Sequence, residues 1–302
     1  MNCKKAAVVG FFDGLHRGHR SLLDFARARA EARGLQPVAV TFRECPIEYL
    51  RPGSSPKLLA SPAERLRALD EYLGQNSVIA LDFNQELATL TAREFMQMLH
   101  DAYGVELLVV GFNNRFGSDR DKTFTDYQAI GREIGMEVER APELTEMKGV
   151  SSSAIRKAIS EGRVDDAAVM LGRRYTITGD VQHGRQVGRT IGFPTANLRP
   201  ADPRLLVPAP GVYSGTAYDA AGTRYPAMVN IGVCPTVSSE GTQTIEAHLI
   251  GFDGDLYGKI LTLEFIGHMR GERRFDSLEE LKTQLEADRA EALQAFSAAS
   301  RQ

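Results

Sequence analysis

The sequence predicts two domains of different fold class, an α/β domain with a parallel sheet and then a closed antiparallel β-barrel with a C-terminal helix. In the first half of the 302 residues, short apolar runs alternate with helical patterns, which is typical of parallel strands joined by crossover helices. From Tyr175 onward, segments of period two are broken by Gly, Pro and Asp turns, which favours a barrel. We place the domains at 1–172 and 173–302.

The first domain is expected to hold five strands. They are the apolar runs 5–10, 37–42, 77–81, 106–110 and 136–139. Helical patterns lie between them at 21–32, 62–72, 92–102 and 124–134, and Thr91 with Glu94 has the form of a capping box. Ligands of such sheets bind beyond the carboxyl ends of the strands. The loops 10–19, 43–46 and 111–120 should therefore converge on one pocket.

Two helices, 153–161 and 164–171, precede the second domain. The strand candidates of that domain are 175–183, 211–218, 224–231, 244–249 and 260–266. Ser277 and Glu280 have the spacing of a helix start, and the last helix is expected to run to about residue 298.

Composition excludes several classes of partner. The net charge is −3, from 36 basic and 39 acidic residues, so nothing favours nucleic acid or a membrane surface. No apolar stretch approaches the ~20 residues of a membrane span, and the start shows no signal-peptide pattern. Cys3, Cys45 and Cys234 are scattered and lack zinc-site spacing. We expect a cytoplasmic monomer or weak homo-oligomer.

The most informative segment is 10–19, which reads Gly-Phe-Phe-Asp-Gly-Leu-His-Arg-Gly-His directly after an apolar run. It predicts a turn that places backbone N–H groups and a helix N-terminus at the end of the first strand, where phosphate binds well. His16 and His19 can face one anion, because Gly18 keeps side-chain bulk from between them. The alternative is a tight turn with merely hydrogen-bonded histidines. The full string resembles the HxGH signature of nucleotidyltransferases.

Three more segments of the first half bear on a nucleotide: 41–46, 110–117 (Val-Gly-Phe-Asn-Asn-Arg-Phe-Gly) and 150–156 (Val-Ser-Ser-Ser-Ala-Ile-Arg). Serine hydroxyls at a helix N-terminus, with Arg156 one turn in, favour a second anion site. A plain N-cap run is the alternative for the serines alone. Together with Arg156 and the other segments, the serines favour a phosphate site over a plain N-cap.

In the second half, spaced glycines precede the sequence Phe-Pro-Thr-Ala-Asn of 193–197. Glycines let backbone approach phosphate, and the neutral oxygens of Thr195 and Asn197 suit Mg²⁺ and phosphate. Glu246 lies in an expected strand between apolar neighbours, where a carboxylate can act as a general base toward a hydroxyl. Spacing alone favours a strand glutamate that faces outward.

Over essentially its whole length the chain resembles the prokaryotic bifunctional riboflavin kinase/FMN adenylyltransferase family, also called FAD synthetases. The segments that carry the resemblance are 10–19, 110–117, 150–156, 184–197 with its Pro-Thr-Ala-Asn core, 230–236, Glu246, 252–258 and 270–275. The resemblance implies a Rossmann-like nucleotidyltransferase domain that adenylylates FMN to FAD, and a six-stranded flavokinase barrel that phosphorylates riboflavin. ATP would be the co-substrate of both.

The resemblance also implies roles for individual residues. Glu246 would be the base for the ribityl 5′-hydroxyl, His16 and His19 would stabilise departing pyrophosphate, and Asn113 would orient the FMN phosphate or the metal. Thr195 and Asn197 would contact Mg²⁺. The remaining residues would bind ATP or flavin: Gly10, Phe12, Asp13, Gly14, Gly18, Gly111, Arg115, Ser152, Ser153, Arg156, Gly184, Gly188, Gly192, Pro194 and Arg270.

Three positions depart from the common family pattern. Cys45 replaces a histidine in the loop after the second strand, Lys122 replaces a frequent glycine, and Gly251 stands where an acidic residue is usual. The alternative functions are a riboflavin kinase with a decayed adenylyltransferase half, and a flavin-sensing or RNA-binding module that keeps the fold. The near-neutral charge argues against RNA.

Overall fold

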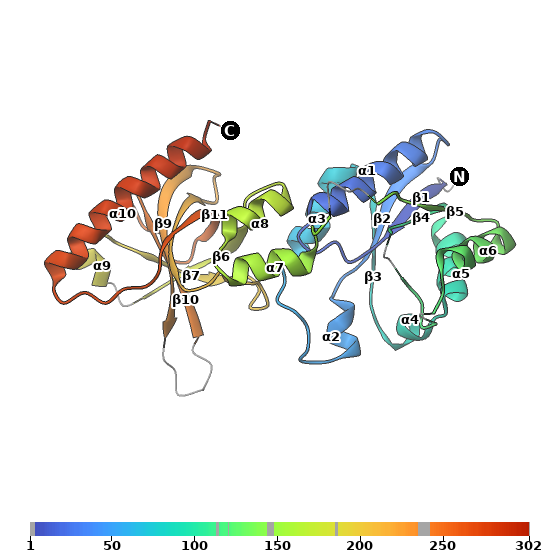
Figure 1. Cartoon of the computed structure of the whole chain (residues 1–302), viewed down its shortest axis with the longest axis horizontal. Helices are drawn as coiled ribbons and strands as arrows, with labels where there is room; N and C mark the ends of the chain where they lie inside the picture. Colours follow the sequence, from blue (N-terminus) through green and yellow to red (C-terminus); the bar gives the residue numbers. More distant parts are fainter. Residues whose placement is uncertain are drawn as a thin grey trace. The chain divides into compact units, whose positions relative to one another are not determined.

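A computed structural model describes residues 4–112, 115–119, 121–143, 148–184, 187–234 and 242–301. The chain forms two compact units (Figure 1). The first comprises Met1–Pro56 and Pro62–Val150, and the second comprises Lys57–Ser61 and Ser151–Gln302. Helices α7 (Ser152–Ser160) and α8 (Val164–Leu171) therefore group with the second unit. A functional boundary after residue 172 stays a prediction.

The first unit is built on a parallel sheet of five strands in the order β3-β2-β1-β4-β5. The central strand pairs in parallel with β2 and β4, so the chain turns in opposite directions after β1 and after β3. The strands are β1 (Lys5–Val9), β2 (Gln36–Phe42), β3 (Val78–Leu81), β4 (Val105–Val110) and β5 (Glu137–Arg140). The sheet confirms the predicted α/β fold.

Helices cover both faces of this sheet (Figure 1). The alternation along β1 explains this, because Ala6 and Val8 belong to one buried cluster with α1 and α3, whereas Ala7 and Val9 belong to another with α5 and α6. The helices are α1 (Arg17–Glu31), α2 (Pro46–Leu50), α3 (Pro62–Leu73), α4 (Gln85–Thr89), α5 (Ala92–Tyr103) and α6 (Phe124–Ile134). The short helices α2 and α4 were not predicted from the sequence.

The second unit is a closed antiparallel barrel in the order β10-β7-β6-β11-β8-β9, as predicted. Its strands are β6 (Thr176–Gln182), β7 (Ala196–Pro200), β8 (Gly211–Tyr218), β9 (Arg224–Cys234), β10 (Thr242–Leu249) and β11 (Ile260–Arg270). Strand β7 was not predicted from the sequence, because it follows directly on the Gly- and Pro-rich segment. The short helix α9 (Val187–Thr190) was also missed, and α10 (Leu278–Ala299) is the predicted last helix.

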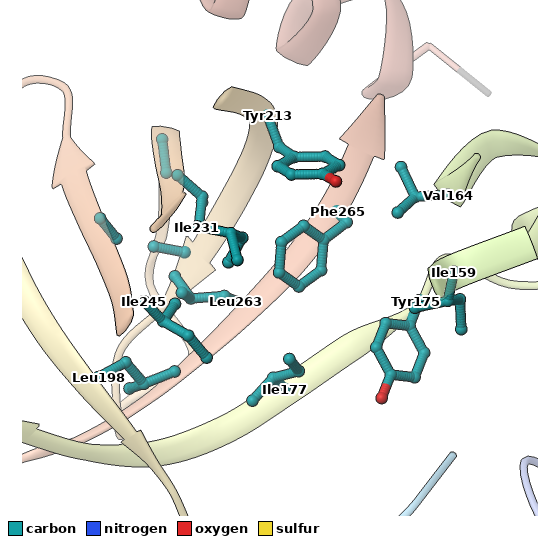
Figure 2. Close-up of a cluster of buried hydrophobic side chains, with 14 of the residues drawn as sticks. Ile159, Val164, Tyr175, Ile177, Leu198, Tyr213, Ile231, Ile245, Leu263 and Phe265 are labelled. Atoms are coloured by element: carbon teal, nitrogen blue, oxygen red, sulfur yellow. The ribbon is translucent and has the colours of Figure 1, made fainter. Parts of the chain in front are cut away.

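Apolar side chains from alternate strand positions fill the barrel. Figure 2 shows Ile177, Leu198, Ile245 and Leu263 within this core, together with residues of α7 and α8. The segment Lys57–Ser61 also belongs to this unit. Its Leu58 N–H donates to the Arg204 carbonyl at 2.8 Å, and the Leu58 carbonyl accepts from Leu206 N–H at 2.9 Å.

Candidate active sites

The turn after β1 has an unusual backbone. Phe12 and Leu15 have φ of 57° and 41°, a region that side chains other than glycine rarely occupy. Strain of this kind persists only where surrounding contacts hold it, and it concentrates at functional sites. Gly14, at φ 79°, continues the turn. A Cβ on Gly10 would lie 3.0 Å from Phe12 Cζ, so the glycine leaves room for the buried Phe12 ring.

His16 and His19 meet at the start of α1. His16 is its N-cap, and its Nδ1 accepts from His19 N–H at 3.2 Å. The two rings stack with centroids 3.6 Å apart, and a Cβ on Gly18 would lie only 3.3 Å from the His16 ring. The side-chain Nδ1 of His19 is buried with no hydrogen-bond partner in the described part of the chain. The structure thus brings both histidines together with an orphaned polar atom, which a bound ligand can satisfy.

Burial lowers the pKa of His19 well below its usual value, and the neighbouring His16 lowers it further. His19 is therefore a neutral imidazole at physiological pH. The neutral ring of His19 can donate one hydrogen bond to an anion and adds no buried charge beside His16.

A cavity of about 590 Å³ lies at the carboxyl end of the sheet. The loops after β1, β2 and β4 all reach it, as predicted. Its lining is largely apolar and aromatic, with Arg115 as its charged group: Val9, Gly10, Phe11, Phe42, Pro46, Leu50, Phe83, Leu87, Ala88, Leu90, Phe95, Arg115, Phe116, Gly117 and Ser118. Gly111 directly follows β4, and Asn113 lies outside the described residues. The cavity suits a flat aromatic ligand with an anionic group.

Arg65 on α3 is a site residue that sequence reasoning missed. Its side chain is buried, and its guanidinium donates to the carbonyls of Phe11, Phe42 and Arg43 and to the Thr41 hydroxyl, at 2.6–3.1 Å. Burial lowers the pKa of Arg65, and the charge of buried Asp13 opposes this effect. Arg65 therefore links the turn after β1 to the end of β2 through Phe11 and Phe42, which both line the cavity. Only the Glu-Arg pair in an amphipathic helix marks it in the sequence.

The serine segment begins α7. Ser151, not Ser152 or Ser153, is the N-cap, because its hydroxyl accepts from Ala154 N–H at 3.1 Å. Arg156 Nε donates to the Lys57 carbonyl at 2.7 Å. These residues belong to the second unit, so a triphosphate site shared with the histidines stays a prediction.

In the barrel, Thr195 lies between two cavities, and Glu246 lines one of them. One cavity of about 400 Å³ is lined by Thr195, Glu246, apolar residues of β8, β9 and α10, and further polar and charged residues that include His248, Arg270 and Asp288. A second of about 340 Å³ is lined by Thr195, Pro194 and the 252–257 turn. The Thr195 hydroxyl donates to Glu246 Oε2 at 3.3 Å. Glu246 alternates with Ile245 and Ala247 of the barrel core, so it faces out of the barrel as spacing predicted, and on that outer face it lines a cavity.

The spaced glycines make room for the segment that carries Thr195. A Cβ on Gly184 would lie 2.0 Å from Asn197 Nδ2, and one on Gly188 would lie 2.2 Å from the Phe193 carbonyl oxygen. Gly192 has φ of 85°, which favours glycine. Register adds to this arrangement, because Asn197 on β7 pairs directly with Glu246 on β10.

Arg270 lines the larger barrel cavity, but its guanidinium is bound within the protein. It donates to both carboxylate oxygens of Asp288 on α10, at 2.7–3.1 Å, and Asp288 is buried. Gln284 donates to the same carboxylate at 2.9 Å. Arg270 thus fixes one wall of the cavity.

The structure shows the local environment of the three residues that depart from the family pattern. Cys45 is buried at the start of α2 and makes no side-chain cap bond. Lys122 lies 3.6 Å from the Asp119 carboxylate. Gly251 has φ of 79° in the turn after β10, which an acidic side chain would adopt only under strain. The glycine is therefore compatible with the fold there.

The donor set of the barrel fits a magnesium ion. Within the described ranges, no three His, Cys, Asp or Glu side chains gather as a protein-only metal centre would need. Mg²⁺ usually takes one or two protein oxygens and completes its shell with phosphate and water. Thr195 and Asn197 offer neutral oxygens, and Asn197 occupies the space that the missing Gly184 side chain leaves.

A parallel-sheet unit with paired histidines is followed by a barrel in which a threonine between two cavities donates to a glutamate. Together they define a two-domain transferase that handles phosphate esters. A family model described as FAD synthetase matches residues 1–154, and one described as riboflavin kinase matches 171–296. The chain belongs to the bifunctional riboflavin kinase/FMN adenylyltransferase family, which confirms the predicted resemblance. It is thus an enzyme with both activities, which use ATP, riboflavin, FMN and FAD.

Relatives with that name cover nearly the whole chain. The Pseudomonas fluorescens protein is 41% identical over 95% of this chain and 91% of its own. The Escherichia coli K12 protein is 35% identical over 96% and 92%. A crystal structure of a Streptococcus pneumoniae protein described as macrolide-efflux has a TM-score of 0.85 and 36% identity, and covers 94% of this chain and 92% of that one. None of the helices in the described part of this chain has the length and apolar character that a bilayer crossing requires.

Proposed function

We propose that each unit performs one of the two reactions in its own cavity, riboflavin phosphorylation in the barrel and FMN adenylylation on the parallel sheet. The observation that carries this proposal is Thr195, which lines two barrel cavities at once beside Glu246. Such a wall is where a phosphoryl group can pass from a nucleotide on one side to a hydroxyl on the other.

In the kinase step, riboflavin occupies the cavity that Glu246 lines, and ATP occupies the cavity beside the 252–257 turn. The ribityl 5′-oxygen attacks the γ-phosphorus of ATP. The bond to the β-phosphate oxygen breaks, ADP leaves, and Glu246 takes the hydroxyl proton. Thr195 and Asn197 would hold Mg²⁺, which supplies charge neutralisation to the transferred phosphate.

In the adenylyl step, the aromatic cavity after β1, β2 and β4 holds the flavin ring of FMN. Its phosphate oxygen attacks the α-phosphorus of ATP, and pyrophosphate leaves as negative charge develops on it. His16 and His19 donate to that charge, and Arg115 helps to hold anionic groups. Asn113 keeps its predicted role in binding phosphate as part of this proposal, and the roles of Ser152, Ser153 and Arg156 stay predictions from the sequence.

One incubation tests the proposed function. The purified chain with riboflavin, ATP and Mg²⁺ should form first FMN and then FAD, separated by chromatography, and supplied FMN should form FAD without riboflavin. FMN that accumulates without any FAD would instead identify a kinase with a decayed first unit. Bound flavin without turnover would identify a sensor.

A further inference from the structure

His248 is a buried titratable group of the larger barrel cavity that the proposed chemistry does not use. It follows Glu246 by two residues on β10, so both side chains lie on the same face of the strand. Its side chain lines the same cavity as Glu246. Its Nδ1 lies 2.8 Å from the carbonyl oxygen of Pro194. Since a carbonyl only accepts, Nδ1 carries the hydrogen.

The partner of His248 is the residue directly before Thr195. Strand β10 therefore holds the Pro194–Thr195 segment at two adjacent points. His248 binds the Pro194 carbonyl, and Glu246 accepts from the Thr195 hydroxyl at 3.3 Å. A shift of Pro194 would move Thr195 from Glu246 and from the wall between the two cavities.

The surroundings keep this imidazole neutral and in one orientation. Its side chain is 8% exposed, and its ring packs against Phe193 with centroids 5.2 Å apart. Burial lowers the pKa of His248, the bond to Pro194 raises it, and the positive charge of Arg289 on α10 lowers it. The net effect is a lowered pKa, so the neutral Nδ1–H form is the one that binds Pro194 at physiological pH.

We propose that His248 is a positioning residue for phosphoryl transfer: its Nδ1–H holds the Pro194 carbonyl and so keeps Thr195 aligned with Glu246 between the two cavities. The proposal rests on the proposed kinase function of the barrel. Misplacement of groups by about 1 Å can cost on the order of 10²-fold in rate. The role therefore predicts an effect on kcat more than on KM.

The test compares His248→Asn with His248→Gln. The Asn amide nitrogen falls near the position of Nδ1 and can still donate to Pro194, whereas the Gln amide falls near Nε2 and cannot. We expect His248→Gln to lower the kcat of riboflavin phosphorylation roughly tenfold or more, with little change in either KM. His248→Asn should retain kcat within about threefold, and both variants should adenylylate supplied FMN at the normal rate.

Equal losses in both variants, in step with a lowered melting temperature, would show a packing role and overturn the proposal. So would a normal kcat for His248→Gln. If Glu246→Gln keeps full kinase activity, the proposed function itself is wrong. If Glu246→Gln is inactive and His248→Gln is fully active, only the positioning role of His248 is wrong. Imidazole ¹⁵N shifts of the unmodified chain give a further readout, because an Nε2–H form would contradict the proposal even where a variant does not fold.

Discussion

The two candidate sites of this chain place phosphate-handling groups by different means. On the parallel sheet, the groups lie in loops beyond the strand ends, where a turn with positive φ at Phe12 and Leu15 leads into α1. In the barrel, they lie on or beside adjacent antiparallel strands, where register sets Asn197 opposite Glu246. The first site therefore depends on the backbone that holds the turn. The second depends on side-chain spacing across a ladder.

This difference predicts how each site fails. A strained turn has to be stabilised by contacts with its neighbours. Arg65 stabilises this one by donating hydrogen bonds to carbonyls just after β1 and at the end of β2. A site held by register depends on the few side chains that meet across the strands and on the residues that keep them in place. Substitutions should thus separate the two activities.

The largest effect is expected for Glu246→Gln. Loss of a general base costs on the order of 10²–10⁴-fold, so FMN formation from riboflavin should fall by that factor. FAD formation from supplied FMN should continue, because the adenylylation cavity is lined by residues of the first unit. Product chromatography with each substrate measures both rates. If the rates of FMN formation and FAD formation fall together, the assignment of one reaction to each unit is wrong.

His16→Ala and His19→Ala test the other side of the comparison. Loss of a donor to developing charge should lower kcat of FAD formation by roughly 10²-fold, while riboflavin phosphorylation survives. His100→Ala, on α5 and away from the cavity lining, is the matched control. Melting curves on the same samples decide the alternative, since an unchanged kcat with a lowered melting temperature would leave the histidines as turn supports.

Arg65→Met should destabilise the turn after β1 without removing a group that contacts the substrate. Three strand-end carbonyls lose a buried donor, and each group left unsatisfied costs roughly 1–3 kcal/mol. We expect a clear fall in the free energy of unfolding together with loss of adenylylation. Arg67→Met, on the same helix with 70% of its side chain exposed, should change neither. Urea unfolding and both activity assays provide the readout, and an Arg65 variant as stable as the control would contradict the supporting role.

Gly184→Ala sharpens the register argument. The new Cβ would lie 2.0 Å from the Asn197 amide, so Asn197 must move from its place beside Glu246. We expect roughly a tenfold loss of kinase kcat without loss of FMN adenylylation. Gly267→Ala, whose Cβ would meet Ser214 at an ordinary 3.7 Å, is the control. Equal kinase rates in the two variants would show that Asn197 placement does not matter.

The smallest expected effect is on stability at mildly acidic pH. The pKa values of His19 and His248 are both lowered by burial in the folded chain, so below about pH 6.5 the unfolded chain binds more protons. The free energy of unfolding should therefore fall as pH drops, by at most about 1.4 kcal/mol per pH unit for each histidine. Urea unfolding at pH 7.5 and 5.5 measures this, and His19→Gln should reduce the slope. A stability that rises toward pH 5.5 would contradict the neutral state of the buried rings.

The sequence by itself determined the elements whose cause is local. The apolar run from Ala6 to Val9 predicted the first buried strand, and the 10–19 string predicted the histidine turn at the start of the first helix. The Pro-Thr-Ala-Asn core of the barrel domain and the family followed from residue order. These patterns of burial, turn geometry and motif depend on residues that are close in sequence, so they can be recognised before the fold is known.

Only the tertiary structure decided which distant groups meet. Glu246 alternates like any strand residue, and its contact with Thr195 depends on the pairing of β10 with β7. Arg65 looks like a helix-surface cation until α3 packs against the strand ends. The bonds of His248 to Pro194 and of Arg270 to Asp288 likewise join different secondary-structure elements. Contacts of this kind depend on strand register and helix packing, which are set by the burial of whole surfaces and leave no periodic signal in the sequence.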